Sequence, residues 1–410
     1  MGGTDRAAAG TPRLLRAIND RAALELLLEH GPLSRGQLGI LTGLSKPTAS
    51  QLLSRLESAG LVLPVGTTAA GRPGPAAQLY EINPGAGYVA GLDVNPKRIL
   101  AAVADISGRV LGEEVLDTPG RQAPAPAAEL TATAVDRACA AAGLDRSALC
   151  RVVVGTPGAV DPGTGKLRYA PHLAGWHSPR LVEELTGRLG LPTAVENDVN
   201  LAAVAEQRTG AASRVSDFVL LWAADGSGSG NEGIGAAVVV GGRLHRGHTG
   251  GAGEVGYMPV PGAPLIRNVR RANSGGFQEL AGAGAVRALA REHGLGSGPA
   301  PRLVAKAADP ASGPAGRAVL GELARRLATG LAAMVAVIDP ELVVLSGGIA
   351  AAGGEPLRAL VQEELAAMAV SAPRVAISAV DGSPVLVGAL GSALESARES
   401  LFSASAAASG

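Results

Sequence analysis

Two short amphipathic segments follow each other with only the turn Thr42-Gly43-Leu44 between them. The first begins at Ser34, whose side chain can form a capping box with Gln37, and it ends at the turn glycine. The second begins at Ser45, and its apolar residues repeat at the spacing of one helix face until Ala59-Gly60. Two short helices joined by so tight a turn predict a helix-turn-helix, a motif whose second helix enters the major groove of DNA.

One further helix is predicted before this motif. Ile18, Ala22 and Leu26 recur at helical spacing, and their pattern ends near His30-Gly31-Pro32. The residues before Ile18 are mostly small or polar and have no cap, so residues 1–17 are predicted to form a disordered arm.

A hairpin is predicted after the motif. Residues 61–63 and 78–82 read as two strands, and between them lies Arg72, flanked by glycine and proline. A guanidinium at a hairpin tip can enter the narrow, electronegative minor groove of DNA. Residues 18–82 are therefore predicted to form a winged helix-turn-helix.

The predicted recognition helix presents a face that suits nucleic acid. The chain as a whole is neutral, with 36 basic and 36 acidic residues, but residues 1–82 hold eight Lys and Arg against six Asp and Glu. The outward side chains of this helix can bond phosphates or base edges, and none is acidic. A plain three-helix module with a solvated face is the alternative, and the predicted wing argues against it. The residues predicted to contact double-stranded DNA are Arg35, Ser45, Lys46, Thr48, Ser50, Gln51, Ser54, Arg55 and Arg72.

Composition limits the remaining classes of protein. With 47% hydrophobic residues the chain can bury more than one core, and its longest apolar stretch is interrupted by Asp339-Pro340-Glu341, so no membrane-spanning helix is predicted. The N-terminal residues lack the apolar segment of a secretory signal, which favours a cytoplasmic protein. Cys139 and Cys150 are too few for a disulfide framework and lack the spacing of a metal site, so both are expected to be ordinary interior residues.

The chain from about residue 87 has the pattern of a mixed α/β fold. A helix is predicted over 127–142, and further helical patterns alternate with apolar runs, which favours mixed sheets with helices packed on them. The alanine- and serine-rich end, residues 401–410, is predicted to be a disordered tail. The strand-like runs lie at 91–94, 99–104, 109–112, 151–155, 218–222, 236–240 and 342–345.

Five motifs in order give this body a family resemblance. They are Gly155-Thr156-Pro157-Gly158-Ala159-Val160-Asp161, Ala170-Pro171-His172-Leu173-Ala174-Gly175-Trp176, Glu196-Asn197-Asp198-Val199-Asn200, Ala252-Gly253-Glu254-Val255-Gly256 and Ser346-Gly347-Gly348-Ile349. With them, residues 87–395 resemble the ROK family of sugar kinases and sugar-responsive repressors. The resemblance implies the two-lobed, ribonuclease H-like fold of the actin-like ATPases, with 87–198 plus 385–400 as the first lobe and 199–384 as the second.

The resemblance also implies a sugar pocket. It assigns the lining to Gly158, Asn197, Asp198, Glu254 and Glu279, with Tyr257 at a position where the family has a histidine. Amide and carboxylate groups can hold pairs of sugar hydroxyls, and a buried polar group left without its partner costs about 1–3 kcal/mol. Such a set reads the stereochemistry of a ring. Because Tyr257 can donate only one hydrogen bond, the implied sugar site is an altered one.

The phosphate loops depart from the family pattern. After Asp93 the family's kinases have glycines, whereas this chain has Val94-Asn95-Pro96-Lys97-Arg98, in which proline removes an amide and restricts the residue before it. The second loop reads Asn231-Glu232-Gly233-Ile234-Gly235 and places a carboxylate where phosphates would lie. Although Asp198 could act as a base, neither loop suits ATP, so no phosphoryl transfer is expected.

Two further stretches are predicted to bind neither a metal nor a phosphate. Residues 270–279 correspond to the family's cysteine-rich zinc site but contain no cysteine, so neither a structural zinc nor another cofactor is expected. The glycine- and serine-rich residues 225–230 are predicted to form a flexible loop at the cleft.

The sequence thus predicts a homo-oligomeric regulator of carbohydrate genes, with repression as the first hypothesis. A sugar or sugar phosphate would close the lobes and change the spacing of paired winged helices on an inverted-repeat operator. Two alternatives stay open. One is a sugar kinase with an accessory DNA-binding domain, which ATP-dependent phosphorylation of a sugar would reveal. The other is a ligand-independent regulator, which no sugar would stabilise.

Overall fold

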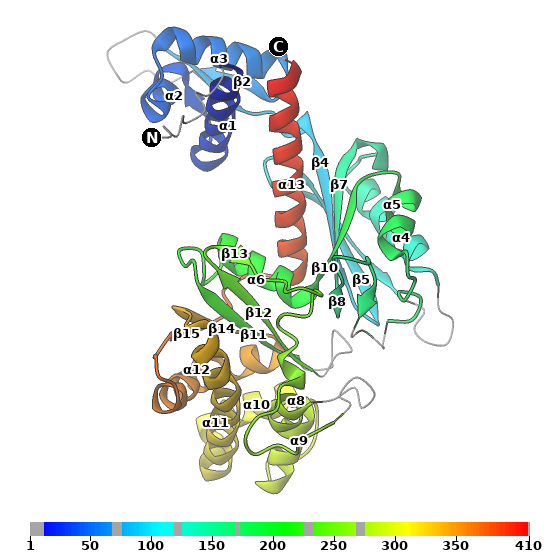
Figure 1. The fold of residues 1–410 in the computed structure, drawn as a ribbon, viewed down its shortest axis with the longest axis vertical. Helices are drawn as coiled ribbons and strands as arrows, with labels where there is room; N and C mark the ends of the chain where they lie inside the picture. The colour runs from blue at the N-terminus through cyan, green and yellow to red at the C-terminus, as the bar shows by residue number, and fades with distance from the viewer. Residues whose placement is uncertain are drawn as a thin grey trace, which may run out of the picture.

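The chain folds into three bodies that follow one another along the long axis of the molecule (Figure 1). The computed structural model describes residues 12–67, 76–118, 125–168, 170, 173–224, 233–267 and 275–408. The N-terminal helices lie at one end, and two lobes, each with its own five-stranded sheet, follow. The last helix, α13 (Pro384–Ala408), runs from the junction of the lobes to the N-terminal helices.

The N-terminal domain contains α1 (Pro12–His30), α2 (Arg35–Thr42) and α3 (Lys46–Ser58). The predicted capping box is confirmed, because the Gln37 N–H donates to Ser34 Oγ at 3.3 Å and the Ser34 N–H donates to Gln37 Oε1 at 2.9 Å. Gly43 follows α2 with a φ of 71°, the left-handed conformation that favours glycine. Ser45 caps α3 as predicted, since its hydroxyl accepts from the Thr48 N–H at 3.4 Å.

A small sheet completes this domain. β2 (Val62–Thr67) and β3 (Gln78–Ile82) form the predicted hairpin, and the short strand β1 (Leu33–Ser34) pairs with β3. Leu24, Leu53 and Leu56 are completely buried in the core that the helices share with the sheet. The winged helix-turn-helix architecture is therefore present. The hairpin tip, which carries Arg72, lies outside the described residues.

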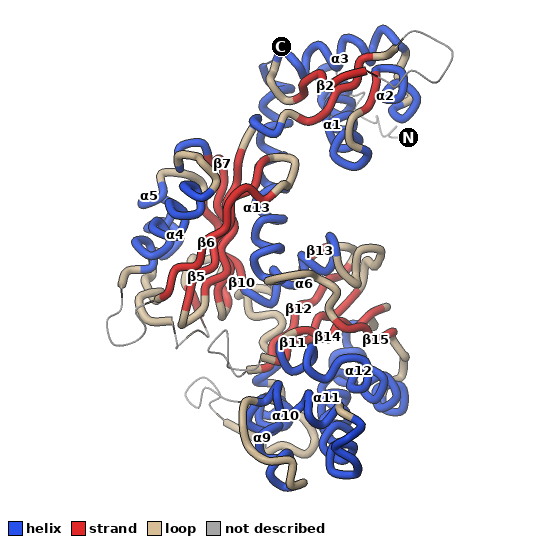
Figure 2. Tube along the Cα trace, turned by 180° about the vertical axis from the view of Figure 1, so that it is seen from behind, coloured by secondary structure: helices blue, strands red, loops and turns tan. Residues whose placement is uncertain are grey.

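The first lobe is built on a sheet with the strand order β10-β7-β4-β5-β6. β4, β5 and β6 are antiparallel, whereas β7 and β10 run parallel to β4. Helices α4 (Ala127–Ala141) and α5 (Leu181–Leu189) cover one face, and α13 packs on the other (Figure 2). Because both faces are covered, the three central strands β7, β4 and β5 are buried along most of their length. The strands are β4 (Tyr88–Val94), β5 (Arg98–Asp105), β6 (Val110–Asp117), β7 (Leu149–Thr156) and β10 (Thr193–Asn197).

The second lobe has the strand order β13-β12-β11-β14-β15. Side chains of β11 alternate between two cores: Val219 and Leu221 face a helical layer, and Phe218 and Leu220 face α6 (Asp198–Thr209). The strands are β11 (Phe218–Ala223), β12 (Ile234–Val240), β13 (Arg243–Leu244), β14 (Leu342–Ser346) and β15 (Arg374–Ile377). The helices are α8 (Gly276–Ala281), α9 (Ala283–Glu292), α10 (Ala300–Ala308), α11 (Gly313–Ile338) and α12 (Gly348–Met368).

Short elements connect these parts. A two-stranded hairpin, β8 (Ala159–Val160) with β9 (Leu167–Arg168), follows β7. Single 3-10 turns are η1 (Pro84–Ala86), η2 (Arg146–Ala148), η3 (Val255–Tyr257) and η4 (Pro310–Ser312). In the part of the chain that the structure describes, no helix combines the length and the apolar character that crossing a bilayer requires.

Both ends of the chain differ from their predictions. α1 begins at Pro12, inside the segment 1–17 predicted as a disordered arm, and α13 continues to Ala408, through most of the predicted tail 401–410. These two helices pack against each other, and Phe402 shares a buried cluster with Leu24. Each end is therefore helical where it has a partner that lies far away in the sequence.

Candidate DNA interface and ligand pocket

α3 buries one face and exposes the other. Its buried residues are Ala49, Leu52, Leu53 and Leu56. On the outer face, one cation and several uncharged polar groups can bond phosphates and base edges, and the exposed acidic Glu57 lies apart from them in the last turn of the helix. Lys46, Thr48, Gln51 and Ser54 are exposed there, and Ser50 is half-buried. Their contact with DNA stays a prediction.

The structure corrects the prediction for Arg55. Its guanidinium Nη2 lies 2.6 Å from Oδ1 of Asp20 on α1, and the Asp20 side chain is only 3% exposed. A carboxylate so deeply buried needs a partner, because removing an ion from water costs several kcal/mol. Arg55 therefore fixes α3 against α1 rather than facing outward with Lys46.

Arg35 and Ser45, two more of the predicted DNA contacts, are exposed, but each already has a partner within the domain. Arg35 at the start of α2 is exposed, stacks 5.4 Å from the ring centroid of Tyr80 and donates to its hydroxyl at 2.5 Å. Ser45 is exposed, but its hydroxyl bonds Thr48 within the α3 cap. Arg35 is thus held in place beside the hairpin, and Ser45 has a structural role whether or not it meets a phosphate.

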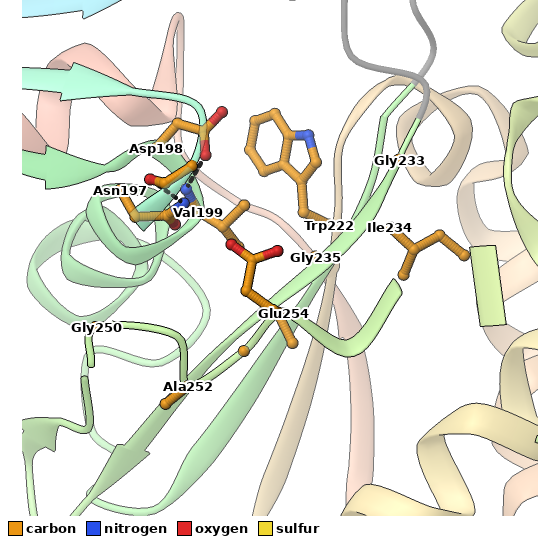
Figure 3. A pocket seen from close by; sticks show the side chains of 13 residues that line it. Asn197, Asp198, Val199, Trp222, Gly233, Ile234, Gly235, Gly250, Ala252 and Glu254 are labelled. Carbon is orange, nitrogen blue, oxygen red and sulfur yellow. Dashed lines mark hydrogen bonds between the residues drawn. The ribbon is translucent and has the colours of Figure 1, made fainter. Parts of the chain in front are cut away.

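A pocket of about 550 Å³, measured with its opening to solvent, lies where the two lobes meet (Figure 3). Asp198 is the first residue of α6, and Glu254 immediately precedes η3. Trp222 from β11 stands between them and the start of β12 (Figure 3). The described lining is Gly158, Asn197, Asp198, Val199, Trp222, Gly233, Ile234, Gly235, Ala236, Gly250, Ala252, Gly253 and Glu254. Four of the predicted ligand residues are therefore brought together.

Asn197 holds the pocket wall together through both ends of its amide. Its Nδ2 donates to the Gly158 carbonyl at 3.0 Å, and its Oδ1 accepts from the Asn200 N–H at 3.0 Å to cap α6. Gly158 has a φ of 83°, and a Cβ there would lie 2.2 Å from the Arg168 carbonyl oxygen. Only glycine fits this turn, and Asn197 positions it.

The pKa values of the two pocket carboxyls are raised well above their ordinary values. Burial raises the pKa of Asp198 to about 7; the Val199 N–H at 2.8 Å opposes the shift, and the charge of Asp93 adds to it. Burial also raises the pKa of Glu254 to about 7, and the nearby Asp198 contributes. Near neutral pH such carboxyls can both donate and accept hydrogen bonds, which suits the hydroxyls of a polyol.

The remaining two predicted ligand residues do not line this pocket. Tyr257 lies half-buried in η3, and Glu279 is exposed on α8. α8 begins against η3, because a Cβ on Gly275 would lie 2.2 Å from the Tyr257 Cα. Their part in ligand binding stays a prediction.

Residues 89–394 match the family model described as the ROK family, and they make up well over half of the chain. The chain belongs to the ROK family. Residues 16–62 match a second model, winged helix-turn-helix DNA-binding. The predicted family and fold class are therefore confirmed.

Three proteins similar to this ROK chain are named as a repressor, a hexokinase and a transcriptional regulator. The xylose repressor of Caldicellulosiruptor bescii is 26% identical over 251 residues, which cover 61% of this chain and 61% of the repressor. The crystal structure of a ROK hexokinase from Thermus thermophilus has a TM-score of 0.62 at 28% identity, over 76% of this chain and 99% of the hexokinase. A ROK transcriptional regulator described as a homologue of the Escherichia coli MLC protein shares the fold over 96% of this chain and 99% of its own, with a TM-score of 0.71 at 20% identity.

The first phosphate loop of this ROK body is closed by its own side chain. Oδ1 of Asn95 accepts from the backbone N–H groups of Lys97 and Arg98, each at 3.0 Å, and Asn95 is 5% exposed. Pro96 has no N–H to offer. Two backbone amides of this turn are thus already bonded within the chain.

The second phosphate loop is described only in part. Gly233, Ile234 and Gly235 line the pocket at the start of β12. The substitution predicted to repel phosphates, Asn231-Glu232, lies outside the described residues, as do the glycine-rich residues 225–230 and most of the predicted zinc region.

Two residues were missed by the sequence reasoning: Trp222 lines the pocket, and Glu196 directly precedes the pocket residue Asn197. Trp222 is one of only two tryptophans in the chain, but nothing in its strand pattern shows which cavity it borders. Glu196 is the first residue of the motif at 196–200, but the sequence did not assign a role to it. Its carboxylate accepts from Asn200 Nδ2 at 2.8 Å and from Arg246 Nε at 2.6 Å, and so braces the start of α6.

Proposed function

We propose that this protein is a DNA-binding transcriptional regulator that represses carbohydrate genes. A sugar in the pocket between its lobes controls its affinity for DNA. The observation that carries the proposal is a combination: an exposed polar face on α3, joined to a ROK body whose first phosphate-loop amides are occupied by Asn95. A body that keeps its sugar pocket without a phosphate site is suited to sensing rather than to phosphoryl transfer.

The chemistry of the pocket favours a neutral sugar over a sugar phosphate. Its described lining contains two carboxyls, Asp198 and Glu254, and neither lysine nor arginine nor histidine. A phosphate brought beside two carboxyls would be repelled in a site of low dielectric constant. Because a relative carries the name xylose repressor, D-xylose is the first sugar to test.

The DNA partner and the assembly follow from the winged helix. A recognition helix of this kind reads a half-site, and two of them in a symmetric homo-oligomer read an inverted repeat at one helical turn or a multiple. Ligand binding that changes the separation of the two helices weakens the complex with the operator. We therefore propose a homo-oligomer on a palindromic operator, located in the cytoplasm with the DNA.

Footprinting on the DNA upstream of the protein's own gene tests this function. We expect a protected inverted repeat that is lost when one sugar of a panel of unphosphorylated pentoses and hexoses is added, and the same sugar should raise the melting temperature of the protein. Protection that no sugar of the panel changes, with an unchanged melting temperature, would favour a ligand-independent regulator.

One observation favours a second candidate, a sugar kinase with an accessory DNA-binding domain. Asp198 is buried beside the pocket with a pKa raised by burial to about 7, a value suited to a general base at neutral pH. Incubating the protein with the sugar panel, ATP and Mg²⁺ and measuring ADP release tests this candidate. We expect no release above the sugar-free control, and release dependent on one sugar would establish the kinase.

A further inference from the structure

Trp222 is the one described pocket residue with a large aromatic surface. In the view of Figure 3 its indole rises from β11 beside the carboxyl of Asp198, and the carboxyl of Glu254 lies below it. Its partner on β12 is Gly235, which has no side chain to cover the indole. A flat apolar face beside hydrogen-bonding groups is the usual composition of a small-molecule site, where apolar walls take up the ligand and polar groups orient it.

The same side chain packs against two buried clusters. One contains Phe218, Leu220 and Val199 and belongs to the second lobe. The other contains Leu201 of α6 and residues of α13, and it continues without interruption into the core of the winged helix-turn-helix. Trp222 therefore borders the ligand pocket on one side and the connection to the DNA-binding domain on the other.

α6 and α13 pack with their backbones in direct contact. A Cβ on Gly388 of α13 would lie 1.9 Å from the carbonyl oxygen of Leu201 on α6, so the two backbones touch. At the beginning of α13, Ser383 Oγ donates to Asp93 Oδ2 at 2.9 Å. At the far end, Phe402 is 9% exposed in the cluster that holds the α1 core. One continuous helix therefore connects the pocket end of the lobes to α1.

We propose that Trp222 stacks on the ring of the bound sugar and is the residue through which occupancy of the pocket acts on α13 and the winged helix-turn-helix. The ligand class is an unphosphorylated pyranose or furanose, whose C–H face lies on the indole while its hydroxyls meet Asp198 and Glu254. This inference rests on the proposed function, because it takes sugar binding in this pocket as given.

Fluorescence of the full-length protein gives a direct readout. The chain has two tryptophans, and Trp176 is buried in the first-lobe core, away from the pocket lining. In a Trp176→Phe background the emission reports Trp222 alone. The probes are D-xylose, D-glucose and N-acetyl-D-glucosamine. We expect one of them to change the emission saturably, with a midpoint equal to that for release of the protein from its operator.

Two substitutions separate stacking from packing. Trp222→Phe keeps an aromatic ring, whereas Trp222→Leu keeps an apolar side chain without one. We expect Trp222→Phe to retain sugar binding within about threefold and Trp222→Leu to weaken it about tenfold, close to the worth of an aromatic contact. Release of the operator by sugar should be lost in Trp222→Leu and kept in Trp222→Phe.

The possible results are distinguishable. If none of the three sugars alters emission, melting temperature or operator binding of the parent protein, the proposed function fails and this inference fails with it. If a sugar binds and releases the operator but Trp222→Leu responds like Trp222→Phe, the proposed function stands and only the role of Trp222 is overturned. Calorimetric titration of the same variants supplies sugar affinity without relying on fluorescence.

Discussion

The guanidinium of Arg55 lies 2.6 Å from the carboxylate of Asp20, so an ion pair joins α3 to α1 inside the DNA-binding domain. The Asp20 side chain is 3% exposed and the Arg55 side chain 27% exposed, which places the pair at the inner edge of the helix packing. Residues of α3 thus divide into those that hold the helix in place and those that are available to DNA.

The substitution Arg55→Met should loosen the domain. It leaves the Asp20 charge buried without a partner, and breaking such a pair costs about 3 kcal/mol, the low end of the usual range because Arg55 is partly exposed. Hydrogen exchange of the α1 and α3 amides should then be about a hundredfold faster. Lys46→Met on the same helix is the matched control and should leave exchange unchanged. Equal protection in Arg55→Met would show that the pair contributes nothing to stability.

On the outer face of α3, some residues should set the affinity for any DNA and others the specificity for the operator sequence. Lys46→Ala removes one phosphate contact, so binding should weaken on all sequences and the slope of log K against log salt should fall by about 1. Gln51→Ala should instead cost about 1–3 kcal/mol on the operator and little on unrelated DNA. Salt titrations by fluorescence anisotropy on both DNAs measure this. If Gln51→Ala weakens both DNAs equally, the assignment of base contacts to this face is incorrect.

The pocket carboxyls should make the stability of the sugar-free protein depend on pH. Burial raises the pKa of Asp198 and of Glu254 to about 7, above the values of about 4 in an unfolded chain. Groups of this kind stabilise the fold fully below about pH 4, and that contribution is lost as the pH rises through about 7. The double variant Asp198→Asn, Glu254→Gln keeps the shape and cannot ionise.

Melting temperatures between about pH 5 and pH 8 test this dependence, with each kcal/mol corresponding to roughly 2–4 °C. The advantage of the double variant over the wild type should grow as the pH rises. Glu292→Gln, a change at an exposed position on α9, is the control and should give a constant difference. A pH-independent difference for the double variant would mean that the two carboxyls titrate normally.

Local signals in the sequence predicted the parts of the fold that depend on neighbours in the chain. The Ser34–Gln37 capping box, the glycine after α2 and the Ser45 cap each involve residues within one helical turn, and all three were found as predicted. Three of the five ROK motifs contribute residues to the pocket, those at 155–161, 196–200 and 252–256. Four of its six predicted ligand residues line one cavity.

What the sequence did not predict depends on contacts between distant segments. Arg55 has the spacing of an outward residue, and only the approach of Asp20 turns it inward. β1 is two residues long and exists because β3 lies beside it. α1 and α13 extend beyond their predicted ends, and the two helices pack on each other. At Asn95 the sequence indicated a poor phosphate loop, but not that the side chain itself bonds the loop amides.

The central claim is that a sugar in the pocket between the lobes controls DNA binding, and one titration tests it most directly. Wild type and Asp198→Asn are each bound to a labelled operator, and the inducing sugar is added while anisotropy is recorded. We predict equal operator affinity without sugar, full release of the wild type and no release of Asp198→Asn, which cannot offer the buried carboxyl. Release of both proteins at the same sugar concentration would contradict the account.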